Sequence, residues 1–329
     1  MSAFGGRTRA IVDAVGGLLL LLYMGAAALA ERNGGSARPL VVLLLASAAA
    51  LAAGRALGHV HRALVPAAVV IGAVAVVVAA GPAIGGAPLG GPFGYRNATG
   101  AFYGLAAVAA LMVAAAVRWL PLRVFGILVA IAFGVAAAKD SSTAGIGLLA
   151  IAVASIAFAG VRAARASIAV GAALVLLVLA GTIALGATYR PGDDNAVIRA
   201  VTERRVVLWR QSLHLMGRRP GGFGPGTFAQ VDRTAQRDAD VRWAHNEFLQ
   251  EGVELGWAGF ALLVLVFGWG FARLWVLPAP DIVAALGAAS LAALGVHASI
   301  DYVLHFPAIP LIAAALVGTA HAVPREVRT

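Results

Sequence analysis

Long runs of apolar residues, each close to the length of a membrane-crossing helix, recur along almost the whole chain. They lie near residues 10–30, 39–54, 64–82, 100–117, 123–138, 144–161, 167–187, 252–272, 281–299 and 303–322. A helix needs about 20 apolar residues to cross a bilayer, and it satisfies its own backbone there. We therefore predict an all-α, polytopic membrane protein of about ten transmembrane helices. The composition agrees, because 61% of the residues are hydrophobic and only 12% are charged.

One long polar segment interrupts these runs, at residues 188–251. It divides the chain into seven predicted spans (1–187), one large loop (188–251), and three spans with a short tail (252–329). In the short loops, arginine collects on one side of the predicted membrane, which marks that side as cytoplasmic. Both termini are then cytoplasmic, and the large loop faces outward. Long loops cross a membrane largely regardless of their charge.

Several classes of function are disfavoured by composition. The net charge of +10 is spread over loops, so no soluble basic domain is present to bind nucleic acid. The chain has no cysteine, which excludes disulfides, thiol nucleophiles and thiolate metal sites. No second histidine follows His245 at the spacing of a helical zinc site. We expect no metal and no cofactor, with chemistry carried by Arg, His, Asp, Glu or hydroxyl groups.

Arginines of the large loop are suited to a diphosphate. Residues 197–216 show helical periodicity, with Arg204 and Arg205 at the edge of the apolar face and Arg210 further along. Arg96 lies in a second external loop, at residues 87–102. A guanidinium donates paired hydrogen bonds to phosphate oxygens and keeps its charge. The alternative is that these arginines reach lipid headgroups.

A glycine-rich turn and a histidine follow these arginines. Gly224 and Gly226 lie in a Gly/Pro turn whose backbone amides could approach a ligand, although such a turn can equally be a connector. His245 and Asn246 open the next helix, and Gly256 shares the face of His245, which predicts a groove beneath the imidazole. Histidine exchanges protons near neutral pH, but a lone interfacial histidine is more often structural.

Two acidic residues complete the candidate set. Asp301 lies near the end of a predicted span, where an acidic group is by default functional, and a structural ion pair with a loop arginine is the competing interpretation. Glu247 is the best candidate for a second acid or base. We interpret His297 and His305 as packing or interface residues.

Residues 204–259 resemble the O-antigen ligase and O-antigen polymerase superfamily of bacterial membrane glycosyltransferases. The similar residues are Arg204 with Leu208, the turn Pro220 to Phe228, His245-Asn246-Glu247-Phe248-Leu249, and Gly256. Weaker similarity covers Gly94-Tyr95-Arg96-Asn97, His297 to Tyr302, and His305-Phe306-Pro307. One departure is Ser142-Thr143-Ala144-Gly145, where many relatives have a Ser-Arg-Gly-like motif; Arg96 or an arginine of the large loop is expected to replace the missing arginine.

The resemblance implies a metal-independent, helical membrane glycosyltransferase on the outer side of the bacterial cytoplasmic membrane. Its donor would be a glycan on an undecaprenyl-diphosphate carrier, and its acceptor a hydroxyl group of a glycan, lipid or protein. The expected mechanism is inverting glycosyl transfer. The leaving diphosphate would be neutralised by Arg204 and Arg205, with Arg210 and Arg96, and the hydroxyl proton would be accepted by His245.

Two alternatives remain open. The first is a polysaccharide polymerase that joins repeat units on the carrier. The second is a transporter or flippase of a lipid-linked or anionic substrate. Transporters place ionisable residues at mid-membrane in broken helices. The spans here are nearly free of charge, and the polar residues collect in the large loop, which favours an enzyme.

Overall fold

The protein is all-helical in the computed structural model, which describes residues 5–84, 91–140, 161–193, 196–238 and 241–322. No strand occurs among these residues. The first helices are α1 (Gly6–Ala30), η1 (Glu31–Asn33), α2 (Arg38–Val60), α3 (Leu64–Ile84), η2 (Gly91–Phe93), α4 (Arg96–Ala116), α5 (Leu120–Asp140) and α7 (Val161–Thr188). The remaining helices are α8 (Ala196–Val201), α9 (Glu203–Arg218), α10 (Phe228–Val231), α11 (Arg233–Arg237), α12 (Glu247–Trp275), α13 (Ile282–Ala298), η3 (Val303–His305) and α14 (Ala308–His321).

Six of the described helices are long and apolar enough to cross a membrane. They lie in α1, α2, α4, α5, α7 and α12. Shorter apolar helices occupy Leu64–Ala79, Ile282–Ala298 and Ala308–His321. The run near 144–161 lies almost entirely outside the described residues, so the number of ten spans stays a prediction. The several apolar helices agree with a membrane protein.

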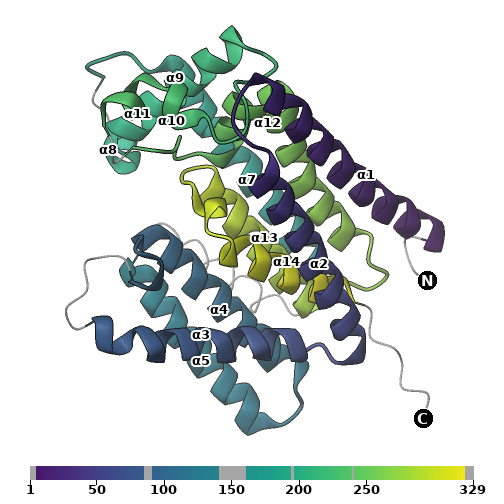
Figure 1. The fold of residues 1–329 in the computed structure, drawn as a ribbon. Helices are drawn as coiled ribbons and strands as arrows, with labels where there is room; N and C mark the ends of the chain where they lie inside the picture. Colours follow the sequence, from purple (N-terminus) through teal and green to yellow (C-terminus); the bar gives the residue numbers. More distant parts are fainter. Residues whose placement is uncertain (1–4, 85–90, 141–160, 194–195, 239–240, 323–329) are drawn as a thin grey trace.

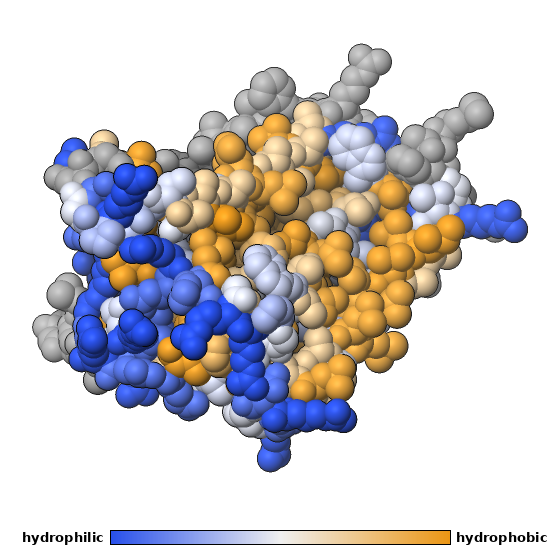
Figure 2. Space-filling view, turned by 90° about the horizontal axis from the view of Figure 1, so that it is seen from above, coloured by the Kyte–Doolittle hydropathy of each residue, from blue (hydrophilic) through white to orange (hydrophobic). Residues whose placement is uncertain are grey.

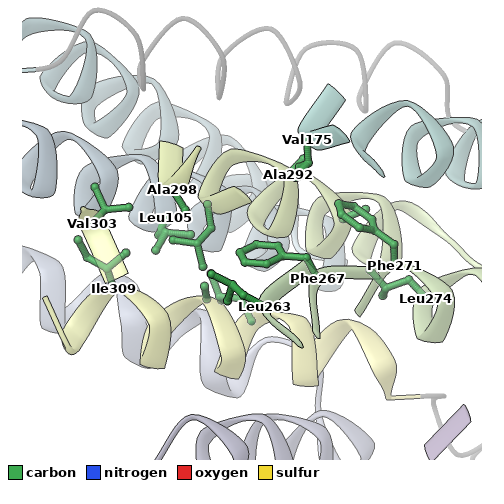
Figure 3. Packing of buried hydrophobic residues seen from close by; sticks show 14 of the residues in the cluster. Leu105, Val175, Leu263, Phe267, Phe271, Leu274, Ala292, Ala298, Val303 and Ile309 are labelled. Carbon is green, nitrogen blue, oxygen red and sulfur yellow. The ribbon is translucent and has the colours of Figure 1, made fainter. Parts of the chain in front are cut away.

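The core of the bundle forms around α12. This helix packs against α1, α7 and α13, and α13 in turn packs against α4 and α14. Leu263, Phe267 and Phe271 of α12 meet Leu105 of α4, Val175 of α7, and Ala292 of α13 in one apolar cluster (Figure 3). Small residues let these helices approach closely: a Cβ on Gly54 of α2 would lie 2.1 Å from the Ala315 carbonyl oxygen of α14.

The predicted large loop forms a helical cap, α8–α11, at one end of the bundle (Figure 1). In Figure 2 hydrophilic residues gather over the side where the cap lies, and hydrophobic residues cover much of the opposite side. The cap sits against α7 and α12 through α9. The start of α1 lies away from the cap, as expected if the N-terminus and the 188–251 segment face opposite sides of a membrane (Figure 1).

An ion-pair cluster joins three helices away from the cap. Asp13 of α1 accepts from Arg55 of α2 at 3.1 Å and from Arg273 of α12 at 2.6 Å. Arg55 and Arg273 follow spans that the sequence predicts to end on the cytoplasmic side, and this cluster brings the two arginines together. That this side of the protein is cytoplasmic stays a prediction.

Candidate active site

The carboxylate of Asp301 is the centre of a polar site beneath the cap. Its Oδ1 accepts from the Tyr302 backbone N–H at 2.8 Å and lies 3.0 Å from Nδ1 of His245. Its Oδ2 pairs with the Arg205 guanidinium at 3.1 Å and accepts from the Asn97 side chain. The Tyr95 hydroxyl lies within 2.8 Å of both oxygens. Five donors thus converge on one carboxyl group.

The end of α13 places Asp301 in this position. The backbone turns after Ala298, and the Asp301 N–H still donates to the His297 carbonyl oxygen at 2.8 Å. The Asp301 side chain is only 1% exposed. A buried carboxylate is stable only when its charge is compensated by donors and cations. Asp301 therefore depends on residues at the start of α4, in α9 and in the segment before α12.

These donors keep Asp301 ionised. Burial alone would raise the pKa of its carboxyl, but the hydrogen bond from His245 and the charge of Arg205 outweigh burial and hold the pKa well below its usual range. Burial, together with the Asp301 charge, raises the pKa of the neighbouring Tyr95 phenol. Tyr95 therefore stays protonated and acts as a donor.

His245 is aimed by the segment that precedes α12. Its backbone has φ of +49°, in the left-handed region that few non-glycine residues adopt. The Trp209 indole N–H donates to its carbonyl oxygen at 3.0 Å. An ionised Asp301 requires a proton on Nδ1, so the neutral imidazole carries its lone pair on Nε2. The side chain is 18% exposed, and Nε2 has no hydrogen-bond partner among the described residues.

Of the four predicted arginines, the structure brings Arg205 to this site. Consecutive helical residues point about 100° apart, so Arg204 and Arg205 of α9 face different surroundings. Arg204, which the sequence assigned with Arg205 to the diphosphate, instead pairs with Asp238 and has a side chain that is 56% exposed. Arg210 is exposed on α9. Arg96 is exposed at the start of α4 and donates to the Lys139 carbonyl oxygen at 3.2 Å.

Compared with known proteins, the chain matches no family model and no curated protein.

The glycine-rich turn has a structural role that the sequence left open. A kink at Gly256 (φ +73°) interrupts α12 and frees two carbonyl groups. The Phe223 N–H donates to Val253 O at 2.9 Å, and the Gly224 N–H donates to Glu254 O at 2.8 Å. The Gly226 N–H donates to the Glu254 carboxylate at 2.6 Å. These amides bind the protein itself, which favours the connector interpretation over ligand binding.

The predicted groove beneath His245 is absent from this face of α12. Asn246 is the N-cap, with its side chain accepting from the Leu249 N–H at 3.0 Å, and His245 precedes the helix. A Cβ on Gly256 would lie 2.1 Å from Pro220 O, and one on Gly252 would lie 2.4 Å from the Met216 side chain. Both glycines are therefore close-packing positions and line no groove below the imidazole.

Glu247 supports a second histidine. Its carboxylate accepts from the Leu304 N–H at 2.7 Å and lies 3.1 Å from Nδ1 of His305. Burial lowers the pKa of His305, but Glu247, with Glu254 and Glu251, outweighs burial and raises the pKa to about 9. His305 is therefore cationic at neutral pH. The sequence had identified Glu247 as a possible acid or base and His305 as a packing residue.

Two residues were missed as site residues. Tyr95 and Asn97 flank Arg96, and their side chains, unlike that of Arg96, reach Asp301. The signal was present in the Gly94-Tyr95-Arg96-Asn97 segment at the start of α4, but the prediction selected the charged residue, Arg96. Helix geometry decides otherwise, because only part of each helical turn faces the site. Within the described residues, no group of His, Asp or Glu side chains is arranged to hold a metal ion.

Proposed function

We propose that this protein is a membrane glycosyltransferase of the O-antigen ligase type. It would transfer a glycan from an undecaprenyl-diphosphate carrier to an acceptor hydroxyl on the outer side of a bacterial cytoplasmic membrane. The observation that carries the proposal is the His245–Asp301 pair, held by Arg205 at the polar end of an apolar helical bundle. A proton acceptor and a cation are the groups that metal-independent transfer from a diphosphate requires.

The chemistry follows from the two functional groups. The acceptor oxygen attacks the anomeric carbon, the bond from that carbon to the diphosphate oxygen breaks, and the carrier diphosphate leaves. The hydroxyl proton passes to Nε2 of His245. The Asp301 carboxylate, 3.0 Å from Nδ1, stabilises the imidazolium that results. The remaining N–H groups of Arg205 stabilise the charge that develops on the diphosphate.

An apolar cavity supports a lipid-linked donor. It has a volume of about 500 Å³, lies between α1, α7 and α12, and is lined by residues that include Leu19, Leu179 and Trp269. Phe248, which directly follows Glu247, also lines it. A long isoprenoid chain requires such a surface, because burying its methylene groups supplies binding free energy.

The test is glycan transfer by purified protein in detergent, with His245→Ala as the decisive variant. We expect a loss of roughly 10²–10⁴ in rate, the usual contribution of a general base. His214→Ala is the matched control, because His214 is exposed on α9. Transfer at the wild-type rate by His245→Ala would refute the assignment. Transfer without a sealed compartment would exclude a pure transporter.

The polymerase alternative makes a different product. A deletion strain that accumulates long glycans on the carrier supports a ligase, whereas single repeat units on the carrier support a polymerase. The extracted glycolipid profile therefore separates the two.

A further inference from the structure

Three arginines gather around one carboxylate between α1, α2 and α12, in the ion-pair cluster away from the cap. Arg55 of α2 lies 3.1 Å from the Asp13 carboxylate, and Arg273 of α12 lies 2.6 Å from it. The charges of Arg55 and of Arg9, one turn before Asp13 on α1, both repel the Arg273 guanidinium. The 29 residues of α12 make a helix roughly 43 Å long, and a hydrocarbon core is about 30 Å thick. Arg273, near the end of α12, therefore lies about one bilayer away from the cap.

The cluster carries more positive charge than negative charge. Among the described residues, Asp13 is the acidic side chain that pairs with these arginines, and it is shared between Arg55 and Arg273. His321 of α14 lies within range of the same charges, and its protonation would only add positive charge. Three guanidinium groups against one carboxylate leave two positive charges without a counter-charge. Charges at the edge of a bilayer are poorly compensated by water, which favours binding of an anion.

Two guanidinium donors of the cluster are also buried without an acceptor. Nε of Arg9 and Nη1 of Arg273, whose side chain is 3% exposed, have no hydrogen-bond partner among the described residues. A buried donor that loses water and finds no acceptor destabilises the folded protein. The Arg55 and Asp13 side chains, by contrast, are 36% and 34% exposed, so the cluster is open on that edge. An anion bound at this edge would supply counter-charge, and rotation of the long arginine side chains would bring the unpaired donors to its oxygens.

The surface beside the cluster is apolar, which favours a lipid over a soluble anion. Leu21, on the same flank of α1 as Asp13 and about two turns further on, is 66% exposed. Ala52 and Ala56, one turn before and one residue after Arg55 on α2, are also exposed. Small and apolar side chains next to cations leave room for hydrocarbon chains beside an anionic headgroup. A phospholipid has both parts, whereas a soluble anion has only one.

We propose that Arg9, Arg55 and Arg273 bind the phosphate group of an anionic phospholipid, from the membrane leaflet on the side away from the cap. A guanidinium group donates paired hydrogen bonds to phosphate oxygens, and basic pockets between transmembrane helices bind phosphate-bearing lipid headgroups. The lipid would join α1, α2 and α12 at one point and stabilise their packing. The site is remote from His245 and Asp301, so this proposal stands independently of glycosyl transfer.

The experiment measures lipid binding by the full-length protein purified in detergent. The protein would be titrated with phosphatidylglycerol, which is anionic, with phosphatidylcholine, which has no net charge, and with inorganic phosphate. Native mass spectrometry counts the bound lipid molecules, and thermal unfolding reports the stabilisation that binding gives. We expect phosphatidylglycerol to bind and to raise the unfolding temperature. Phosphatidylcholine and inorganic phosphate should have little effect on either measurement.

Arg55→Gln is the decisive variant, because it removes a cation from the open edge and leaves the Asp13–Arg273 pair in place. It should weaken phosphatidylglycerol binding at least about fivefold, the contribution expected of one arginine. The matched control is Arg118→Gln, which removes the charge of an exposed arginine between α4 and α5 and should bind as the wild type does. Asp13→Asn should act in the opposite direction: it removes the competing carboxylate, so phosphatidylglycerol should bind more tightly while the lipid-free protein unfolds at a lower temperature.

Equal binding of phosphatidylglycerol and phosphatidylcholine would overturn the site, as would equal phosphatidylglycerol binding by the wild type and Arg55→Gln. A similar loss in Arg118→Gln would show that the lipid responds to net charge alone, which would also overturn it. Stabilisation by inorganic phosphate that displaces phosphatidylglycerol would overturn the lipid assignment and give the arginines to a soluble phosphate compound. Should Asp13→Asn fail to fold, the comparison of Arg55→Gln with Arg118→Gln still decides.

Discussion

Replacement of Asp301 by asparagine is the sharpest test of the site, because it keeps the size of the side chain and removes its charge. Asp301 receives donors on both oxygens: His245 and the Tyr302 N–H at Oδ1, and Arg205 and Asn97 at Oδ2. Whichever position the new amide NH₂ takes, it faces donors. At least one protein donor then loses its acceptor, and Arg205 loses its counter-charge.

The magnitude follows from burial. The Asp301 side chain is 1% exposed and that of Arg205 is 20% exposed, so water compensates little. Breaking a buried ion pair by removing one partner costs about 3–5 kcal/mol. For catalysis, an asparagine no longer holds His245 as the Nδ1–H tautomer, and in serine proteases the corresponding change lowers kcat about 10⁴-fold.

The assay combines thermal unfolding with glycan transfer. Asp301→Asn should lower the unfolding temperature by several degrees and reduce transfer by at least about 10²-fold. The control is Asp238→Asn, which removes the charge that pairs with Arg204. The Asp238 side chain is 31% exposed, against 1% for Asp301, so this change should cost no more than about 1 kcal/mol. An Asp301→Asn protein with wild-type stability and wild-type transfer would refute the network described for this carboxylate.

Three further predictions concern neighbouring residues. Arg205→Ala should reduce transfer at least about tenfold, whereas Arg204→Ala, whose side chain pairs with Asp238, should stay near the wild type; equal losses would contradict the assignment. The His305–Glu247 pair raises the His305 pKa from 6.5 to about 9, so its stabilisation is complete below about pH 6.5 and is lost as the pH rises through about 9. Unfolding temperatures across this range should show that loss in the wild type and lack it in His305→Gln. Gly256→Ala places a Cβ 2.1 Å from Pro220 O and should destabilise the fold strongly. Gly226→Ala has the same φ of +73° with no atom within 4 Å, so its cost should be limited to about 1–2 kcal/mol of backbone strain.

Part of the candidate site was within reach of the sequence. The polar segment, His245, Arg205 and Asp301 stand out in a chain of apolar spans, because an ionisable group beside a membrane needs a partner or a function. The ion pair between Asp301 and a loop arginine was predicted as an alternative and is confirmed with Arg205. The sequence assigned both Arg204 and Arg205 to the diphosphate, but the orientation of α9 turns Arg205 towards Asp301, whereas Arg204 pairs with Asp238.

The glycines illustrate the same division. Positive φ at Gly224 and Gly226 agrees with the turn predicted from Gly and Pro, but the hydrogen-bond partners of the turn lie in α12. Periodicity placed His245 and Gly256 on one helical face, yet the helix begins at Glu247 and is kinked at Gly256. Neither the start of the helix nor the kink is encoded in the spacing of these residues.

Hydrophobicity by itself determined that this chain is helical and apolar enough for a membrane, since an isolated apolar run must satisfy its backbone internally. It also determined where the polar segment lies. Only the tertiary structure brought together Tyr95 and Asn97 at the start of α4, Arg205 of α9, His245 before α12, and Asp301 after α13. The physical reason is that hydrophobic burial depends on the amount of apolar surface and is non-directional, whereas hydrogen bonds and ring contacts depend on distance and orientation between distant segments.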